Sequence, residues 1–269
     1  MANARSVPVL MHHHVSPSPG MITVSPENFE SQIAWLAHNG WTSLTLAQYA
    51  DFLAGKPVPR KSIVITFDDG YLDNWVYAHP ILLKYGMHAV VFVVTGWMGE
   101  GPVRPHAGQP GVTLPPTPDH RGCEAAILRD DRTDEVMMRW SEARAMIAAG
   151  TFEVHCHTHT HTRWLRRDDL DRAQRRAGIS NDLALSRQVL QDKLGEDAWL
   201  ALEKKIGIGP TELLTGMVYD DTLTLEIVSE AAARLNLTTD ECLFEFGRYW
   251  IDYASRGSLS SAMELTGHD

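Results

Sequence analysis

Ser62-Ile63-Val64-Ile65-Thr66-Phe67-Asp68-Asp69-Gly70 is the stretch that indicates the fold most directly. Its first six residues are largely β-branched and apolar, which is typical of a strand buried within a parallel sheet. The run ends at two adjacent carboxylates and a glycine. A turn explains one aspartate, but two like charges this close repel one another unless a cation or hydrogen bonds offset the repulsion. A bound metal would hold one aspartate as a ligand and leave the other free to act as a base.

A second polar cluster lies in the segment 153–164, which reads E-V-H-C-H-T-H-T-H-T-R-W. His155, His157, His159 and His161 alternate, so they would share one face if the segment were extended. Neutral imidazole is the commonest protein ligand for zinc and similar ions. The pattern favours a metal site completed by a carboxylate from elsewhere. The alternative is a solvated loop that is rich in histidine by chance.

The flanking sequence predicts alternating strands and helices. Strands are predicted at about residues 7–11, 88–94 and 151–156, and helices at about 26–40, 46–53, 73–85 and 140–150. Pro80 is expected to break or kink the third helix. Glycine and proline are dense from 95 to 118, which predicts a long surface loop extending toward Asp131. The alternation is that of parallel βαβ units, in which active sites gather at the carboxyl ends of the strands.

The first predicted strand runs straight into three histidines, His12, His13 and His14. Ligand-type residues at the end of a strand are typical of an active-site edge. An exposed turn is an equally good interpretation, because Pro17, Pro19 and Gly20 follow at once. The three histidines are therefore secondary candidates for the site.

Composition narrows the classes of function. The chain has 269 residues, 44% of them hydrophobic, and a net charge of -10 from 34 acidic and 24 basic residues. This balance argues against a nucleic-acid partner. No apolar run is long enough to span a bilayer, and the N-terminus lacks the apolar core of a secretory signal. We expect a cytoplasmic protein, or else an exported mature form lacking its signal. Three scattered cysteines give no disulfide framework.

Thr66-Phe67-Asp68-Asp69-Gly70 and His157-Thr158-x-x-His161 together resemble the first two motifs of the polysaccharide deacetylase family, also called the NodB-homology family or carbohydrate esterase family four. The resemblance extends over about residues 7–190. It includes the leading V-P-V-L-M-H-H-H-V, the F-D-D-G-Y-x-D-N-W stretch and the R-W-S-E segment around Trp140. It is most similar to branches that act on polymers of the poly-N-acetylglucosamine type.

This resemblance implies a role for four residues. Asp69, His157 and His161 would bind a divalent metal, with zinc the expected ion, and Asp68 would be the base that takes a proton from the attacking water. The metal and a nearby backbone N–H would stabilise the oxyanion. The implied reaction is removal of N-acetyl groups from an amino-sugar polysaccharide.

The sequence departs from the family pattern after the second motif. His155 and His159 match no family ligand. The later strands are not found, nor are the arginine-proline motif, the aromatic groove wall and the late histidine that serves as general acid. The segment His12 to His14 is a candidate source of a substitute acid. Activity is expected to be weak or absent if none of them replaces the missing group.

The tail, about residues 190–269, resembles the N-terminal helical part of the haem-nitric-oxide-binding (H-NOX) family. The matching sequence segments are G-E-D-A-W, Y-D-D-T, A-A-A-R-L-N-L and F-G-R-Y-W-I-D-Y. That family holds haem through a histidine and a Y-x-S-x-R motif that come later, so no haem ligand is assigned here. Haem or gas sensing is the weaker hypothesis.

The sequence thus predicts an α/β fold: a partial (β/α) barrel-like deacetylase domain over 1–190, and an α-helical segment over 191–269. The predicted function is metal-dependent deacetylation of an amino-sugar polymer. The alternatives are a haem-binding module in the tail, or an inactive metal-binding chimera. A partial barrel leaves an open sheet edge. We expect the helical tail to cover it, or the chain to form a homo-oligomer across it.

Overall fold

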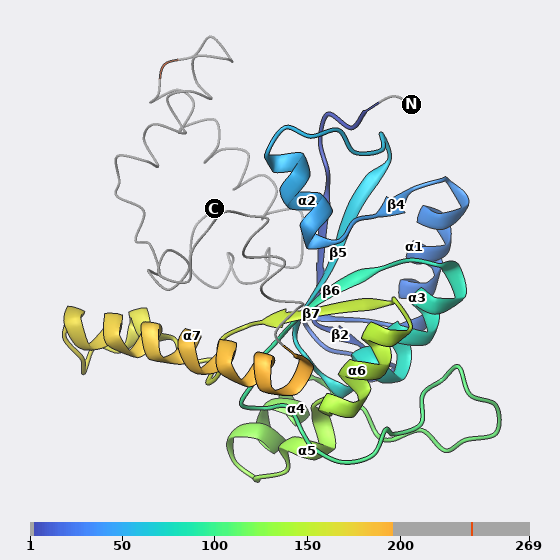
Figure 1. Ribbon diagram of the computed structural model, residues 1–269. Coiled ribbons are helices and arrows are strands. Elements are labelled where there is room, and N and C mark those ends of the chain that lie inside the picture. The colour runs from blue at the N-terminus through green and yellow to red at the C-terminus, as the bar shows by residue number, and fades with distance from the viewer. Residues whose placement is uncertain (1–2, 196–237, 239–269) are drawn as a thin grey trace, which may run out of the picture. The chain divides into compact units, whose positions relative to one another are not determined.

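The computed structural model describes residues 3–195 and Thr238. The chain forms two compact units, Met1–Thr215 and Gly216–Asp269, and every described helix and strand belongs to the first. The centre of this unit is a five-stranded parallel sheet, as expected (Figure 1). Its strands are β1 (Val9–His12), β4 (Thr42–Ser43), β5 (Ser62–Asp69), β6 (Ala89–Val93) and β7 (Phe152–Cys156). They run in the order β1-β5-β6-β7, and β4 pairs with the start of β5.

Seven α-helices connect or cover these strands in the described part of the chain. They are α1 (Pro26–His38), α2 (Leu46–Leu53), α3 (His79–Tyr85), α4 (His120–Leu128), α5 (Thr133–Val136), α6 (Trp140–Ala148) and α7 (Arg172–Leu194). Two short strands, β2 (His14–Val15) and β3 (Thr23–Val24), form a separate parallel pair. The helices predicted around 26–40, 46–53 and 140–150 are confirmed, as is the strand–helix alternation.

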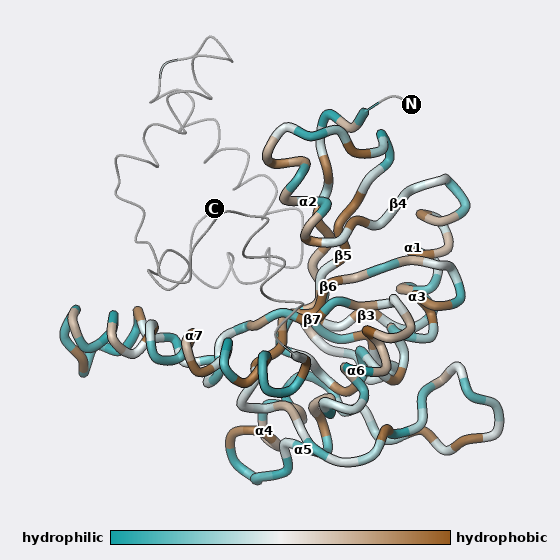
Figure 2. The backbone as a smooth tube through the Cα atoms, viewed as in Figure 1, coloured by the Kyte–Doolittle hydropathy of each residue, from teal (hydrophilic) through white to brown (hydrophobic). Residues whose placement is uncertain are grey.

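Side-chain alternation along the strands produces two hydrophobic layers. On one face, Phe67, Val91 and Phe152 pack with buried residues of α1, α3 and α6. On the other face, Val64 and Val90 pack with Leu44, Val58 and the aromatic rings of α2. Figure 2 shows the hydrophobic stretches concentrated along the central strands, whereas α7 is mostly hydrophilic. The sheet therefore holds the carboxyl ends of its strands rigidly at one edge.

The helix predicted at 73–85 is broken, as the proline in it suggested. A π-helical turn (Asn74–Ala78) leads directly into α3, where Pro80 occupies the first turn. Such turns are common at functional sites. The side-chain amide of Asn74 donates to the backbone oxygen of His13 at 2.8 Å. The turn thereby fixes the chain just after β1.

The long loop predicted from 95 toward 131 is wrong in its second half, because α4 begins at His120. Asp119 caps this helix, accepting a hydrogen bond from the backbone N–H of Gly122 at 2.8 Å. Its buried residues Cys123 and Ala126 pack against Tyr71 and Met137. A nine-residue helix is marginal by itself, so these tertiary contacts, which local sequence does not reveal, decide the outcome.

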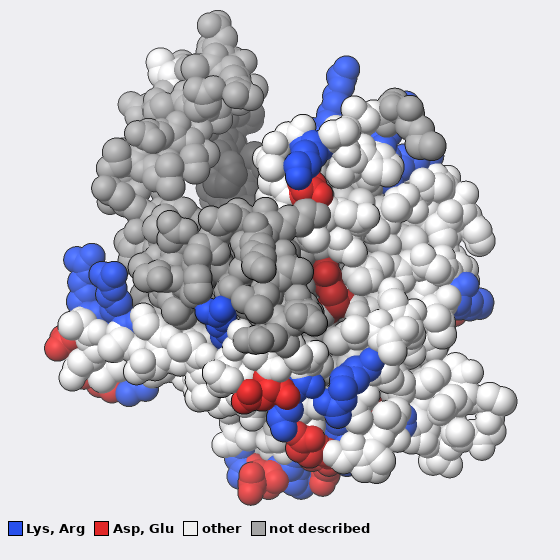
Figure 3. All heavy atoms as spheres, viewed as in Figure 1, with Lys and Arg blue, Asp and Glu red and all other residues white. Residues whose placement is uncertain are grey.

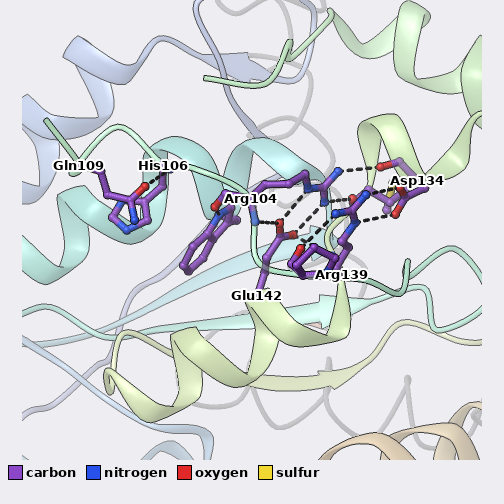
Figure 4. A network of polar contacts seen from close by, with 9 residues as sticks. Arg104, His106, Gln109, Asp134, Arg139 and Glu142 are labelled. Atoms are coloured by element: carbon purple, nitrogen blue, oxygen red, sulfur yellow. Dashed lines mark hydrogen bonds and ion pairs between the residues drawn. The ribbon is translucent and has the colours of Figure 1, made fainter. Parts of the chain in front are cut away.

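The segment between β6 and α6, which contains α4 and α5, is called the insertion below. A buried ion pair connects its start to α6 (Figure 4). The guanidinium of Arg104 donates two hydrogen bonds of 2.8 Å to the carboxylate of Glu142, which is fully buried. Arg104 also donates to the backbone oxygens of Asp134 and Met137, at 2.6 and 2.7 Å. Arg139 pairs with Asp134 beside it. The network fastens the loop after β6, α5 and α6 into one body.

Within the described residues, β1 and β7 form the two ends of the sheet. Near β1 two large apolar side chains are well exposed, Met11 at 67% and Trp35 at 58%. An open edge was expected from the incomplete barrel pattern. The tail that was predicted to cover it lies outside the described residues, apart from 191–195 and Thr238, so that covering stays a prediction.

Charges of both signs lie side by side on the surface shown in Figure 3, particularly over α4 and α5. Ion pairs there include Arg132 with Asp130 and Arg139 with Asp134. The described helices include none with the length and apolar character needed to cross a bilayer.

Candidate metal centre

The carboxyl ends of β5, β6 and β7 meet at one point of the sheet. Asp69 pairs in register with Val93, and Val93 pairs with Cys156, the last residue of β7. The residues that follow Cys156 therefore emerge beside Asp69. This register explains how motifs almost ninety positions apart form one site.

Three of the predicted ligands come together there. The Nε2 atoms of His157 and His161 lie 3.5 and 3.6 Å from Oδ1 of Asp69. One donor atom from each of the three lies within 4.8 Å of the others, and Asp69 is buried. Burial lowers the pKa of His161, which favours the neutral imidazole that a metal requires.

The donor set fits a divalent cation. Among residues 3–195, the buried Oδ1 of Asp69 has no hydrogen-bond partner, although two imidazoles face it. A buried carboxylate oxygen without a partner is costly, and a cation between the three groups would satisfy it. Two nitrogens and one oxygen, with further positions open, form the ligand set of many catalytic zinc sites.

The histidine run is not one extended strand, so the condition under which its four imidazoles would share a face is not met, whereas the strand predicted to end at Cys156 is confirmed. Strand β7 ends at Cys156, and the chain then turns through positive φ values at Thr158 (67°) and His161 (55°). Only His155 lies on the strand, buried beside Glu153 and away from the triad. The ring of His159 lies 3.0 Å from the Thr95 hydroxyl.

Asp182 of α7 holds this turn in shape. Its Oδ1 accepts from the backbone N–H groups of His159 and Thr160 at 3.0 and 2.9 Å. Its Oδ2 accepts from the Thr160 hydroxyl at 3.0 Å and from the Trp164 indole at 2.9 Å. Sequence reasoning missed this residue. The available signal was an aspartate in line with Ser186 and Leu190, the other buried positions of α7.

The loop after β6 holds the same turn from the opposite side. The backbone N–H of Thr95 donates to Thr158 at 3.1 Å, and that of Gly96 donates to His159 at 3.0 Å. A Cβ at Gly96 would lie 2.5 Å from the His159 carbonyl oxygen, so only glycine permits this approach. The ligand turn is therefore clamped between two elements.

Asp68 and His13 face each other at the edge of the site. Nε2 of His13 lies 3.9 Å from Oδ2 of Asp68, and both side chains are partly exposed. Of the three N-terminal histidines, His13 is the one that reaches the triad's cavity. His12 instead packs against the rings of Phe29 and Phe67, and its burial lowers its pKa.

His14 is buried and is not among the residues that line the cavity. Its Nδ1 lies 2.7 Å from Oδ2 of Asp73, and both side chains are almost fully enclosed. Its Nε2 lies 3.4 Å from Nδ1 of His120, and its ring stacks on Tyr71 at 3.8 Å. Burial, together with Asp69, raises the pKa of Tyr71. This arrangement links the N-terminal strand to α4, which the sequence did not predict.

The triad opens into a cavity of about 650 Å³, a size typical of ligand pockets. His13, Tyr71, Trp97 and Ile22 form part of its wall, and residues of α4 form another part. The cavity can hold a polar ligand beside the three donors, with His13 in its wall and Asp68 3.9 Å from His13. Such a geometry suits hydrolysis assisted by a metal.

Comparison with known proteins identifies two families. A family model described as polysaccharide deacetylase matches residues 55–202, which include both motifs. A second model, described as haem-NO-binding, matches residues 183–269. The two matches overlap over 183–202, which includes the second half of α7. Both resemblances stated from the sequence are thus found again.

Two curated relatives match part of the chain. YxkH of Bacillus subtilis, which carries a polysaccharide deacetylase name, is 40% identical over 95 residues, 35% of this chain and 34% of its own length. A poly-β-1,6-N-acetyl-D-glucosamine N-deacetylase of Staphylococcus aureus is 40% identical over 80 residues, 29% of this chain and 27% of its own length. The matched stretches thus span about a third or less of these relatives.

Solved structures share the fold. IcaB from Ammonifex degensii aligns with a TM-score of 0.52 at 21% identity, covering 76% of this chain and 81% of its own. A de-N-acetylase from Aggregatibacter actinomycetemcomitans aligns with a TM-score of 0.52 at 21% identity, covering 74% and 84%. The parallel-sheet α/β fold predicted from the sequence is confirmed by these alignments.

Proposed function

Because the chain belongs to the polysaccharide deacetylase family, we propose that it is a metal-dependent hydrolase that removes N-acetyl groups from an amino-sugar polymer of the poly-N-acetylglucosamine type. The observation that carries the proposal is the triad of Asp69, His157 and His161 around one unpartnered carboxylate oxygen. The substrate class is supported by the likeness to the Staphylococcus aureus enzyme over the segment it matches.

Asp69, His157 and His161 would hold the cation, with zinc the expected ion. A bound divalent cation supplies Lewis-acid activation of water and of the acetyl carbonyl. The three side chains contribute a single negative charge, so the occupied site remains positive and favours the oxyanion of an acyl-transfer reaction. The clamped turn keeps the two imidazoles in place without substrate.

Asp68 is assigned as the general base. It neighbours Asp69 but points to a different partner, His13, which lines the cavity, and its own side chain is partly exposed. A carboxylate in this position can accept a proton from the attacking water. Since it is not among the triad, its negative charge remains free for that task.

His13 is assigned as the general acid. Hydrolysis of an N-acetyl group needs a proton on the departing amine nitrogen, and the triad's histidines cannot donate one while they bind a cation. His13 lines the same cavity, 3.9 Å from Asp68. The two groups thus balance the reaction. Asp68 takes one proton from water as the water oxygen bonds to the acetyl carbon, and His13 gives one to the nitrogen as the C–N bond breaks. The products are the amine and acetic acid, which ionises to acetate, and the proton on Asp68 returns to His13 through solvent.

The experiment is acetate release from a β-1,6-linked N-acetylglucosamine oligomer by zinc-loaded protein and by the Asp68→Asn variant. We expect the variant to lose about 10²- to 10⁴-fold in rate with its zinc content unchanged. An Asp192→Asn variant on the exposed side of α7 is the control. Equal rates for Asp68→Asn and wild type would exclude the mechanism. Stoichiometric zinc without turnover in the wild type would favour an inactive metal-binding protein.

A haem-binding function is the second candidate, because the haem-NO-binding model matches residues 183–269. Almost all of that segment beyond Gly195 lies outside the described residues. Reconstitution with haem tests it directly. A Soret band with a one-to-one titration would support a haem site, and a spectrum identical to free haem would reject it.

A further inference from the structure

Helix α4 packs against the buried Tyr71 cluster and also lines the cavity of the candidate metal centre. One side of the helix, with Cys123 and Ala126, is buried against Tyr71 and Met137. Tyr71 follows Asp69 by two residues. The helix is therefore anchored to the strand that carries the ligand, so its other side has a fixed position relative to the triad.

A stripe of α4 lines the cavity, and its members His120 and Ile127 also contact the Tyr71 cluster. The stripe consists of His120, Glu124, Ile127 and Leu128, which are spaced four, three and one residues apart. Positions at i, i+4, i+7 and i+8 share one face of an α-helix. All four line the same cavity as Asp69 and the two ligand histidines. The insertion thus contributes a continuous wall to the site.

The stripe is polar at its start and apolar at its end. His120 is held there by its contact with His14, whose other ring nitrogen is bonded to the buried Asp73. Glu124 lies one turn further along. Leu128 is 64% exposed although it lines a cavity. An exposed large apolar side chain at a ligand-sized cavity, beside two polar side chains of which His120 is held in place, has the composition of a binding surface.

We propose that this stripe is the wall that binds the sugar chain next to the reacting unit, an inference that rests on the proposed function. Glu124 accepts hydrogen bonds from sugar hydroxyls, and His120 supplies a second polar contact. Ile127 and Leu128 cover the apolar C–H face of a sugar ring. The wall then selects a polymer over a small acetylated compound, because only a chain extends beyond the triad to reach α4.

The test compares two substrates for each variant. One is a β-1,6-linked N-acetylglucosamine pentamer, and the other is 4-nitrophenyl acetate, which has an acetyl group but no sugar. For Leu128→Ala we expect the ratio of kcat/KM for pentamer over ester to fall about tenfold, chiefly through KM for the pentamer. For Glu124→Gln, which keeps the shape and removes the charge, we expect about a fivefold fall.

Leu53→Ala is the matched control, because Leu53 is 68% exposed at the end of α2 and lines no part of this cavity. Its ratio should equal that of the wild type. An unchanged ratio in both α4 variants, or equal losses for pentamer and ester, would overturn the inference while leaving the proposed function standing.

Failure of the proposed function has a different signature, which is no acetate from either substrate in the wild type. In that case calorimetric titration of the zinc-loaded protein with the pentamer still tests the wall. We expect about tenfold weaker binding by Leu128→Ala than by wild type and Leu53→Ala. Equal binding by all three, or none by the wild type, would reject it.

Discussion

Three residues of the candidate site adopt backbone conformations that L-amino acids rarely occupy. Asp69, Thr158 and His161 have φ values of 72°, 67° and 55°. Thr158 is β-branched, and a positive φ is particularly unfavourable for such a side chain. Each such residue costs on the order of 1–3 kcal/mol, and such residues cluster at functional sites. Two of the three are proposed ligands, so the fold maintains strain where the metal would bind.

Asp182 holds the turn that contains Thr158 and His161, which leads to the first prediction. Asp182→Ala removes four acceptor contacts from the ligand turn, so His157 and His161 should lose their fixed orientation. We expect zinc affinity to fall about 10- to 100-fold, as for other residues that orient metal ligands. Competition with a fluorescent zinc chelator measures it.

The control is Asp192→Ala on the same helix, since Asp192 is exposed and bonds only to Gln188 among the contacts described for it. It should leave zinc affinity unchanged. If Asp182→Ala and Asp192→Ala bound zinc equally well, the turn would not depend on α7 for its shape.

At the scale of elements, sequence patterns predicted those parts of the fold whose signals are local. The strand Ser62–Asp69 is a buried β-branched run, and α1 and α2 follow Ser25 and Thr45, whose side chains cap them. The segment 120–128 was predicted as part of a loop, because the helix there is short and depends on contacts with Tyr71 and Met137. The ligands Asp69, His157 and His161 were predicted from motif spacing. The bent turn that unites the histidines depends on Asp182 and Gly96, which local periodicity does not reveal.

The ion pair that joins the insertion to α6 yields the second prediction. Glu142→Gln removes the charge opposite Arg104 in a buried, fully bonded network (Figure 4). Breaking one side of a buried pair costs about 3–5 kcal/mol, because the other charge is left without compensation. We expect the free energy of unfolding to fall by about 3 kcal/mol, as measured by urea denaturation.

Glu135→Gln serves as the comparison. Glu135 pairs with Arg132 on the surface, where both side chains are more than half exposed. Such pairs contribute about 0–1 kcal/mol. A loss of this small size in Glu142→Gln would mean that the network around α6 adds little to stability.

A third prediction concerns Glu153, whose carboxylate lies between His88 and His155 and accepts a hydrogen bond from Leu46 at the start of α2. Burial opposes its charge, but the two nearby histidine rings and the hydrogen bond from Leu46 lower its pKa to about 2. Burial likewise opposes charge on His88, yet the nearby Glu153 carboxylate and the hydrogen bond to the Gly150 backbone oxygen raise its pKa above the usual value. The cluster joins β6, β7 and α2 electrostatically.

The pH dependence of stability follows from the lowered pKa of Glu153 and the raised pKa of His88. Glu153 has a lowered folded pKa, so its contribution is complete above the ordinary value of 4.5 and is lost as the pH falls toward 2. His88 has a raised folded pKa, so its contribution is complete below 6.5 and is lost as the pH rises through the folded value. The difference in free energy of unfolding between wild type and Glu153→Gln should therefore be largest between pH 4.5 and pH 6.5. Urea titrations at about pH 3, 5.5 and 8.5 check this. A difference independent of pH would contradict it.

At the scale of the whole molecule, the described sheet has an end strand with exposed apolar side chains. β1 pairs with β5 on one side, and among described residues it has no second neighbouring strand. Met11 and Trp35 are more than half exposed beside it, next to a groove of about 600 Å³. Unpaired edges with apolar side chains promote association with another chain unless something covers them.

The fourth prediction is that this edge mediates self-association. Met11→Lys places a charge on the edge strand, a substitution that natural proteins use to block edge pairing. We expect the wild type to form dimers whose dissociation constant rises at least about tenfold in the variant, as measured by analytical ultracentrifugation. Met21→Lys is the control, because Met21 is 88% exposed but lies in the loop between β2 and β3. A wild type that stays monomeric at all concentrations would show that no second copy pairs with this edge, and the tail would then be the remaining candidate for covering it. Equal dissociation constants for the two lysine variants would instead place the dimer contact elsewhere on the molecule.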